Sequence, residues 1–248
     1  MANGPDSDDA GLTGNLDGIE ALSFDCYGTL IDWETGIGRV LVPWARRSGL
    51  DLDADTLVDR FGATETGVQL DHPTWPYPEV LAEVLRRIGS GLGVPVSAVD
   101  AEAFGRSVGA WPAFDDSAEA LQRLAGRFRL VVLSNVDPVS FRLSNDRLGV
   151  EFDHLVLAGD VGAYKPASVM FDRLETTLTD HGLDPGALLH VAESLYHDHL
   201  PALARGWRTA WVHRRHAVGG FGATAPVDVP VRPTVTVPSM AALARLLC

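Results

Sequence analysis

Short apolar segments, each bounded by polar or turn-forming residues, recur along this chain and constrain its fold more than any other feature. Each has the length of a β-strand, and the segments are Ala21–Phe24, Leu130–Leu133, Leu155–Ala158, Leu188–Ala192 and Thr209–Val212. Helical patterns accompany the later four, at Ser117–Arg127, after the Asp137–Pro138 cap, at Pro166–Asp180 and at Asp198–Arg205. This alternation predicts an α/β fold with a parallel sheet covered by helices on both faces.

A long interval separates the first strand from the second, and its pattern is helical. The predicted helices there are Gly36–Leu50, Asp53–Thr66, Pro78–Ile88 and Ala101–Val108. We therefore expect residues 34–112 to form a helical cap domain, inserted into a core domain of residues 19–33 and 113–248. The tryptophans of the insert are expected to fill its core, with Trp33 or Trp111 as an alternative wall of a substrate cleft. Near the C-terminus, Pro233–Val237 is expected to form an edge strand and Ser239–Leu247 a closing helix.

Composition excludes several classes of protein. Apolar residues make up 46% and charged residues 21% of the 248 residues, which is typical of a globular protein. No apolar run is long enough to span a membrane, and residues 1–18 lack the basic start of a secretory signal, so we expect a disordered tail there. The net charge of −13 disfavours a nucleic-acid partner. Two widely spaced cysteines, Cys26 and Cys248, favour the cytoplasm.

Polar residues follow the predicted strands. Asp25 and Thr29 follow the first strand, and Ser134 and Asn135 close the second. Later in the chain come Lys165 after the third strand, and Glu193 and Asp198 after the fourth. Ligands bind beyond the carboxyl ends of the strands in open α/β sheets, so these side chains should meet in one cleft. They supply what nucleophilic catalysis by a carboxylate requires.

The order of these motifs resembles the haloacid dehalogenase (HAD) superfamily. The motifs are a strand followed by Asp-Cys-Tyr-Gly-Thr-Leu, then Leu-Ser-Asn, Tyr-Lys-Pro and an acidic fourth motif. Tyr27, two residues after Asp25, resembles the (S)-2-haloacid dehalogenase (type II) branch. The match runs from about Ile19 to the C-terminus. It implies a Rossmann-like core with a helical cap, no cofactor and a homodimer.

The resemblance also implies roles for the core residues. Asp25 would be the nucleophile, Lys165 would keep Asp25 ionised, and Asp198 would position or activate the hydrolytic water. Ser134 and Asn135 would donate hydrogen bonds to the substrate carboxylate.

Further implied roles concern the loop after the first strand and the cap. Gly28 and Thr29 would form a tight turn that brings backbone N–H groups to the substrate. Tyr27 suits a dehalogenase because a departing halide needs no general acid; alternatively it packs against the insert. Arg60, with Arg39 as a fallback, would bind the small anionic substrate and the departing halide.

The fourth motif departs from the dehalogenase pattern. Glu193 and Leu195 stand where that branch carries Ser and Asn, although Asp198 fits. The segment also resembles a phosphatase pattern, in which Asp25, the Tyr27 carbonyl, and Asp198 or Glu193 would hold Mg²⁺. Phe171 likewise replaces a Tyr of the branch.

Three functions follow from these observations. The leading hypothesis is hydrolytic dehalogenation of short 2-haloacids, such as 2-chloropropionate, through an aspartyl ester and without a cofactor. The alternatives are a Mg²⁺-dependent phosphatase of a small phosphorylated metabolite, and a non-catalytic binding protein on a HAD scaffold. A zinc site at His197 and His199 is not expected, because the two side chains would point to different faces of a helix.

Overall fold

Seven strands form one sheet at the centre of a computed structural model, which describes residues 11, 12 and 14–248. The strand order is β1-β7-β6-β5-β2-β3-β4. All neighbours from β7 to β4 pair in parallel, and β1 pairs antiparallel to β7. The strands are β1 (Gly11–Leu12), β2 (Ala21–Phe24), β3 (Arg129–Ser134), β4 (His154–Leu157), β5 (Leu188–Ala192), β6 (Arg208–Val212) and β7 (Val235–Val237). The predicted α/β class is confirmed.

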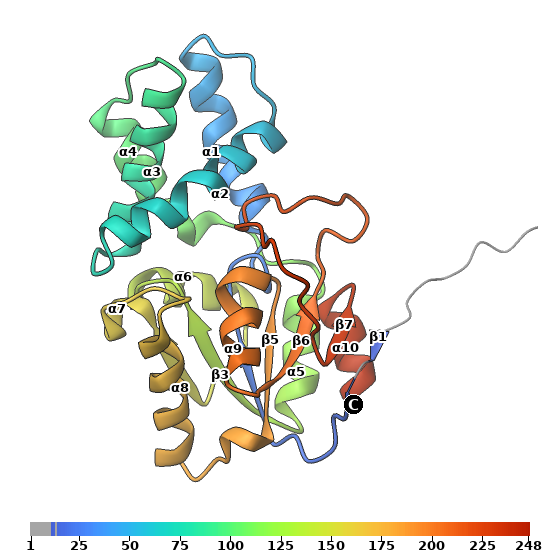
Figure 1. Ribbon diagram of the computed structural model, residues 1–248. Coiled ribbons are helices and arrows are strands. Elements are labelled where there is room, and N and C mark those ends of the chain that lie inside the picture. The colour runs from blue at the N-terminus through green and yellow to red at the C-terminus, as the bar shows by residue number, and fades with distance from the viewer. Residues whose placement is uncertain (1–10, 13) are drawn as a thin grey trace, which may run out of the picture.

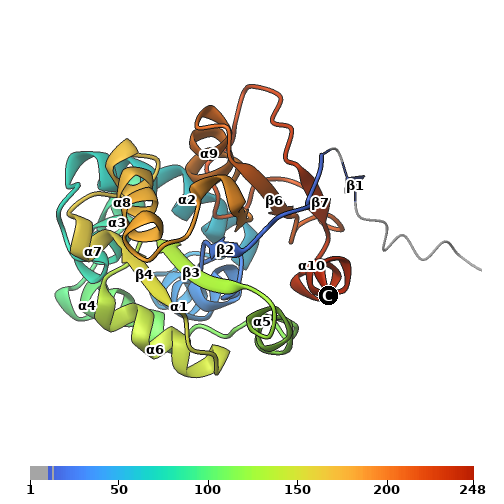
Figure 2. The same ribbon diagram turned by 90° about the horizontal axis from the view of Figure 1, so that it is seen from below.

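Helices cover both faces of this sheet, as Figure 2 shows. One face carries α5 (Ser117–Ala125), α6 (Pro138–Leu148) and α10 (Met240–Leu247), and the other carries α8 (Ser168–Asp180) and α9 (Leu200–Ala204). With helices on both sides, every residue of the two central strands β2 and β5 is buried. The interior of the sheet is therefore mostly apolar, with Ser23 of β2 and His190 of β5 as buried polar exceptions.

The interval after β2 forms a group of helices above the carboxyl ends of the strands (Figure 1). These helices are α1 (Trp33–Arg47), α2 (Ala54–Asp71), α3 (Tyr77–Gly91) and α4 (Ala98–Gly105), followed by a 3₁₀ turn at Val108–Ala110. We call α1–α4 the cap. Asp53 caps α2 through a hydrogen bond from the Thr56 N–H. The expected end of α2 at Thr66 is wrong, because the helix continues for more than a turn, to Asp71.

Two expectations about the ends of the chain need correction. Gly11 and Leu12 of the expected disordered tail pair with Thr236 and Val235, and residues 1–10 and 13 lie outside the described residues. The strand expected at the edge, β7, therefore lies between β6 and β1. Within the described residues, no helix is long and apolar enough to cross a membrane.

Candidate active site

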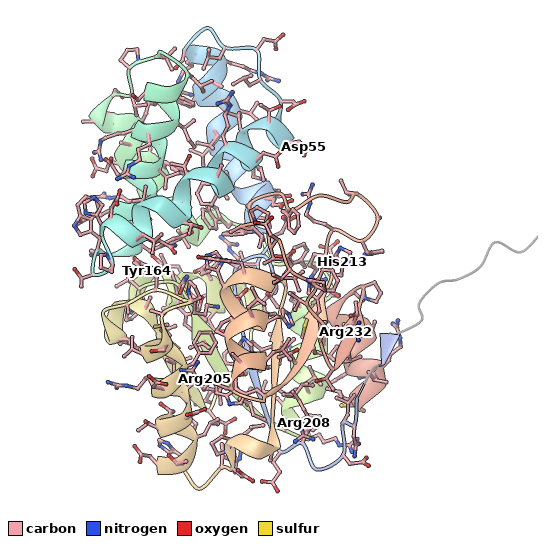
Figure 3. The ribbon with its side chains drawn as sticks, in the orientation of Figure 1. Asp55, Tyr164, Arg205, Arg208, His213 and Arg232 are labelled. Carbon is pink, nitrogen blue, oxygen red and sulfur yellow. The ribbon has the colours of Figure 1, made fainter. Side chains whose placement is uncertain are left out.

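The predicted site residues come from four segments that end at the same edge of the sheet, beneath the cap. Asp25 follows β2, Ser134 ends β3, and Glu193 follows β5, while Lys165 lies in the loop before α8. Figure 3 shows Tyr164, the neighbour of Lys165, at the boundary between the cap and the core. The Tyr164 hydroxyl donates to the carbonyl of Trp75 in the cap, at 2.5 Å.

Lys165 joins two carboxylates at the centre of the site. Its Nζ donates to Asp25 Oδ1 at 2.9 Å, to Asp198 Oδ1 at 2.7 Å and to the Leu133 carbonyl at 2.9 Å. All three charged residues are buried. Burial would lower the pKa of Lys165, but Asp198 and Asp25 outweigh it and raise this pKa above its usual value. The ammonium group is therefore permanently charged at neutral pH.

The pKa values of the two buried carboxyl groups shift in opposite directions. Burial raises the pKa of Asp25, and the negative charge of Asp198 adds to the rise, while Lys165 offsets part of it. For Asp198, Lys165 and His190 outweigh burial and hold the pKa well below its usual range. Asp198 is therefore the fixed anion of the group, and Asp25 is the more readily protonated one.

A second line of contacts supports Asp198 from inside the sheet. His190, in the middle of β5, places Nε2 at 2.9 Å from Asp198 Oδ1 and Nδ1 at 2.8 Å from Ser23 Oγ in β2. Asp198 itself lies in a π-helical turn, Leu195–His199, which leads into α9. Such turns occur frequently at functional sites. His190 is not among the residues predicted for the site, although a histidine inside an otherwise apolar strand segment is a visible signal.

The two residues that close β3 have different environments. Asn135 Oδ1 accepts from the Lys165 N–H at 2.6 Å, and Asn135 Nδ2 donates to the Lys165 carbonyl at 3.1 Å. Asn135 thus fixes the backbone of Lys165, whereas we had expected it to bind substrate. The Ser134 hydroxyl is buried and has no hydrogen-bond partner in the described part of the chain. Ser134 is therefore the member of the pair whose hydroxyl is free to bind a ligand.

The loop after β2 differs from its expected role. Thr29 Oγ1 donates to Asp25 Oδ2 at 2.7 Å and accepts from the Glu193 N–H at 2.9 Å, so Thr29 orients the Asp25 carboxylate. Gly28 has φ +89°, where a Cβ would lie 2.9 Å from Trp33 Nε1. The Gly28 N–H donates to the Ile31 carbonyl at 2.8 Å, so this N–H closes the turn and is not free for substrate.

The aromatic ring of Tyr27 forms part of the wall of the site. The ring packs edge-on against Trp111, with centroids 5.7 Å apart. Its hydroxyl lies 2.9 Å from Ser144 Oγ of α6, and burial raises the pKa of Tyr27 well above its usual value. The phenol therefore stays protonated and is bonded to the core.

The cap residues that reach the site are not the expected ones. Arg60 and Arg39 are both exposed, and neither lines the site. The opposite face of α2 carries Glu65 and Gln69 toward the core, where Gln69 Oε1 accepts from Asn135 Nδ2 at 3.4 Å. Glu65 is only 3% exposed, and its Oε1 accepts from the Tyr77 hydroxyl at 2.7 Å. Neither Glu65 nor Gln69 is among the residues predicted for the site.

These side chains enclose a small chamber. Its free volume is about 30 Å³, and its lining residues are Asp25, Tyr27, Trp33, Glu65, Tyr77, Ser134, Asn135, Lys165, Ser194, His197 and Asp198. A larger cavity of about 300 Å³ adjoins it, lined by Gly28, Trp33, Glu193, Arg214 and Asp55, among others. Trp33 lines both spaces, and its alternative role as the wall of a substrate cleft stays a prediction.

The expected Mg²⁺ ligands do not surround one point. Lys165 engages one oxygen of both Asp25 and Asp198. Glu193 lines the larger cavity, where its Oε2 accepts from the Thr224 hydroxyl at 2.6 Å, and burial raises the pKa of Glu193 to about 8. Within the described residues, no group of three or more His, Cys, Asp or Glu side chains is arranged to hold a metal. The residues present do not fit the ion.

Several known proteins with related sequences or structures are 2-haloacid dehalogenases. No family model matches the chain. An (S)-2-haloacid dehalogenase from Pseudomonas sp. (strain YL) is 25% identical over 213 residues, which cover 80% of this chain and 84% of that protein.

Two solved structures have a similar fold over most of this chain. A defluorinating L-2-haloacid dehalogenase has a TM-score of 0.75 and 22% identity, with 92% of this chain and 95% of that chain covered. An L-2-haloacid dehalogenase from Xanthobacter autotrophicus, with chloropropionic acid covalently bound, has a TM-score of 0.75 and 19% identity, with 92% and 98% covered.

Proposed function

Because this chain is a haloacid dehalogenase-like protein of the HAD superfamily, we propose that it removes halide from short 2-haloacids or their amides through an ester on Asp25. One observation carries this proposal. The Asp25 carboxylate ends a central strand inside a buried chamber, with one oxygen bonded to Lys165 and the other to Thr29. Such a carboxylate is fixed in direction, and a neighbouring cation favours its reactive, ionised form.

The first step is a displacement at carbon. An Asp25 oxygen attacks C2 of the substrate, the new C–O bond forms as the carbon–halogen bond breaks, and the halide leaves with the electron pair. The leaving halide needs no proton, which agrees with a Tyr27 hydroxyl bonded to Ser144 and not available as an acid. The Lys165 ammonium then has Asp198 as its remaining anionic partner.

The second step is hydrolysis of the ester. Water attacks the Asp25 carbonyl carbon and gives one proton to His197, and the bond between that carbon and the ester oxygen breaks. The proton on His197 passes to the departing alkoxide, which leaves as the 2-hydroxy product, and the Asp25 carboxyl group loses the remaining proton to solvent. The low pKa of Asp198 makes it a weak base, so in this proposal Asp198 orients the water through its unpartnered Oδ2. His197 accepts the proton because its imidazole is neutral at neutral pH: burial lowers its pKa to about 4, and the nearby Asp198 anion offsets part of this shift and stabilises the imidazolium that forms.

His197 lines the chamber, and its Nε2 has no partner in the described part of the chain. This role requires the tautomer in which Nδ1 carries the proton and donates to Ser194 Oγ, 3.1 Å away.

Halide release in the presence of EDTA tests the proposal. We expect purified protein to release chloride from 2-chloropropionate or 2-chloropropionamide with EDTA present, and the Asp25→Asn protein to release none above the spontaneous rate. A single turnover in ¹⁸O-water should label Asp25, because water attacks the carboxyl carbon of that residue. Chloride release that persists in Asp25→Asn would overturn the nucleophile assignment. Phosphate release from p-nitrophenyl phosphate that depends on Mg²⁺, without any chloride release, would favour the phosphatase.

The role of His197 has its own readout. We expect the His197→Asn protein to form the Asp25 ester but hydrolyse it slowly, so that intact mass spectrometry detects the alkylated protein. An absence of this species, together with an unchanged steady-state rate, would exclude His197 as the base.

A cytoplasmic location and a homodimer also remain predictions. Cys26 is buried, and both Cys26 and Cys248 are free thiols, which suits a reducing compartment. Light scattering of the purified protein measures the oligomeric state directly.

A further inference from the structure

We propose that the chamber selects an uncharged 2-halo amide over the 2-haloacid anion, and that Glu65 of α2 sets this preference. The inference rests on the proposed function, because it narrows the substrate class of the same site. It follows from three features of the chamber: its charge balance, the surroundings of Glu65 and the position of the free hydroxyl of Ser134.

The charge balance leaves no cation for a substrate carboxylate. Three carboxyl groups line the chamber, those of Asp25, Glu65 and Asp198. Lys165 is the one cation among the described lining residues, and both Asp25 and Asp198 already bind it. A buried carboxylate without a cation or several hydrogen-bond donors is costly. A 2-haloacid anion would add a further such group here.

The arginines that might compensate are elsewhere. Arg60 is exposed on the outer face of α2. Arg214 is partly buried beside the loop after β2, where it donates to the Thr29 carbonyl at 2.9 Å and pairs with Asp116 at 2.9 Å. Its donors are thus committed to the scaffold.

Glu65 is held in the chamber without a cationic partner. Phe61, Glu65 and Gln69 follow one another at intervals of four residues, which places them on one face of α2. The one hydrogen bond described for Glu65 comes from the Tyr77 hydroxyl to Oε1. Burial raises the pKa of Glu65 to about 7, and the nearby charge of Asp25 adds to the rise. Above this pH, Glu65 is an anion that repels a carboxylate and accepts hydrogen bonds from an amide NH₂ group.

On the core side of the chamber, Ser134 offers a hydrogen-bond donor. Ser134 lines the same chamber, and its buried hydroxyl has no partner in the described part of the chain. A hydroxyl donates well to the carbonyl oxygen of an amide. Acceptors on the cap and a donor on the core therefore match the two ends of a carboxamide, whereas a carboxylate has two acceptor oxygens and no donor.

The test compares two substrates that differ only in this group. At about pH 8, where Glu65 is ionised, we expect wild-type kcat/KM for chloride release to be at least about tenfold higher for 2-chloropropionamide than for 2-chloropropionate. Glu65→Gln keeps an oxygen for the Tyr77 hydroxyl but removes the charge. We expect it to raise kcat/KM for 2-chloropropionate by about tenfold and so reduce the preference. Glu79→Gln, the same change at an exposed position of the cap, should leave the ratio unchanged.

A second variant guards against misfolding of the first. Gln69→Arg adds a cation one turn along the same face of α2 and should also increase turnover of 2-chloropropionate relative to the amide. Rates from Asp25→Asn are subtracted throughout, because a chloroamide also alkylates exposed thiols such as Cys248.

A wild-type preference for the anion, or a ratio that neither variant changes, would overturn this inference while leaving the proposed function standing. An absence of Asp25-dependent chloride release from both substrates would overturn the proposed function and this inference with it.

Discussion

Replacing Lys165 with methionine removes the one cation among the described lining residues of the chamber and leaves Asp25 and Asp198 without their shared partner. The side chain is almost fully buried and donates hydrogen bonds to both carboxylates and to the Leu133 carbonyl. Methionine fills a similar volume, so the main loss is electrostatic. Breaking a buried ion pair by removing one partner costs about 3–5 kcal/mol, because the remaining charge is uncompensated. We expect the free energy of unfolding at neutral pH to fall by this amount.

The loss should depend on pH in a defined direction. In the wild type, the pKa of Asp198 lies well below its usual value, so its ionised form stabilises the protein above about pH 4. This stabilisation is lost only as the pH falls through the lowered native pKa. Without Lys165, burial raises the native pKa of Asp198, and the ionised carboxylate destabilises the variant above about pH 4. The difference between the two proteins should therefore shrink as the pH falls from neutrality toward 4.

Urea unfolding followed by tryptophan fluorescence measures both effects. The control is Arg106→Met, which removes a cation from an exposed pair with Glu102 and should cost less than about 1 kcal/mol. Adding Asp198→Asn to the Lys165 variant should recover part of the lost stability, because it removes one unpaired charge. A loss of under about 1 kcal/mol at pH 7, or one equal at both ends of the pH range, would refute the account of this network.

Three smaller changes test other parts of the site. Thr29→Val removes a hydrogen bond that lowers the pKa of Asp25, so the acidic limb of a kcat/KM–pH profile should move to higher pH. Gly28→Ala forces a side chain into φ +89° and against Trp33, and urea unfolding should show a loss of about 1–3 kcal/mol. Arg60→Ala changes an exposed side chain remote from the chamber, so steady-state halide release should stay within about twofold of the wild type; a larger loss would place Arg60 in the site.

The arrangement of the core could be predicted because it depends on local patterns. The bounds of β2 and β5 match the predicted segments, and the catalytic candidates follow the strand ends as the rules for parallel sheets require. Asp25, Lys165 and Asp198 meet because these ends converge. A single sequence motif at the end of each strand carries most of this information.

The residues that the cap contributes to the site could not be predicted, because they depend on which face of α2 meets the core. Arg60 and Glu65 lie five residues apart, so one is exposed where the other is buried. A signal was present, since Phe61 and Val68 are apolar residues of the buried face and Glu65 lies between them at helical spacing. Glu65, a carboxyl group on an otherwise apolar helix face, was the sequence signal for a cap residue that reaches the site.

The sequence also does not show which donors and acceptors are already used in hydrogen bonds within the protein. Asn135 and Gly28 have the right chemistry to bind a substrate, but Asn135 bonds to the backbone of Lys165 and the Gly28 N–H to Ile31. A motif gives the type of each group and not the partner that occupies it.

The lysine at the centre of the site is also the only lysine in the 248-residue chain. Protein grown on ¹⁵N-lysine would therefore carry one labelled ammonium group, and its three hydrogen bonds would slow proton exchange enough to give a distinct resonance. Alkylation of Asp25 would neutralise one of its partners and shift that resonance, and hydrolysis would return it. The protein thus contains a single-site spectroscopic probe, whose signal follows the formation and breakdown of the ester without any mutation or chemically attached reporter group.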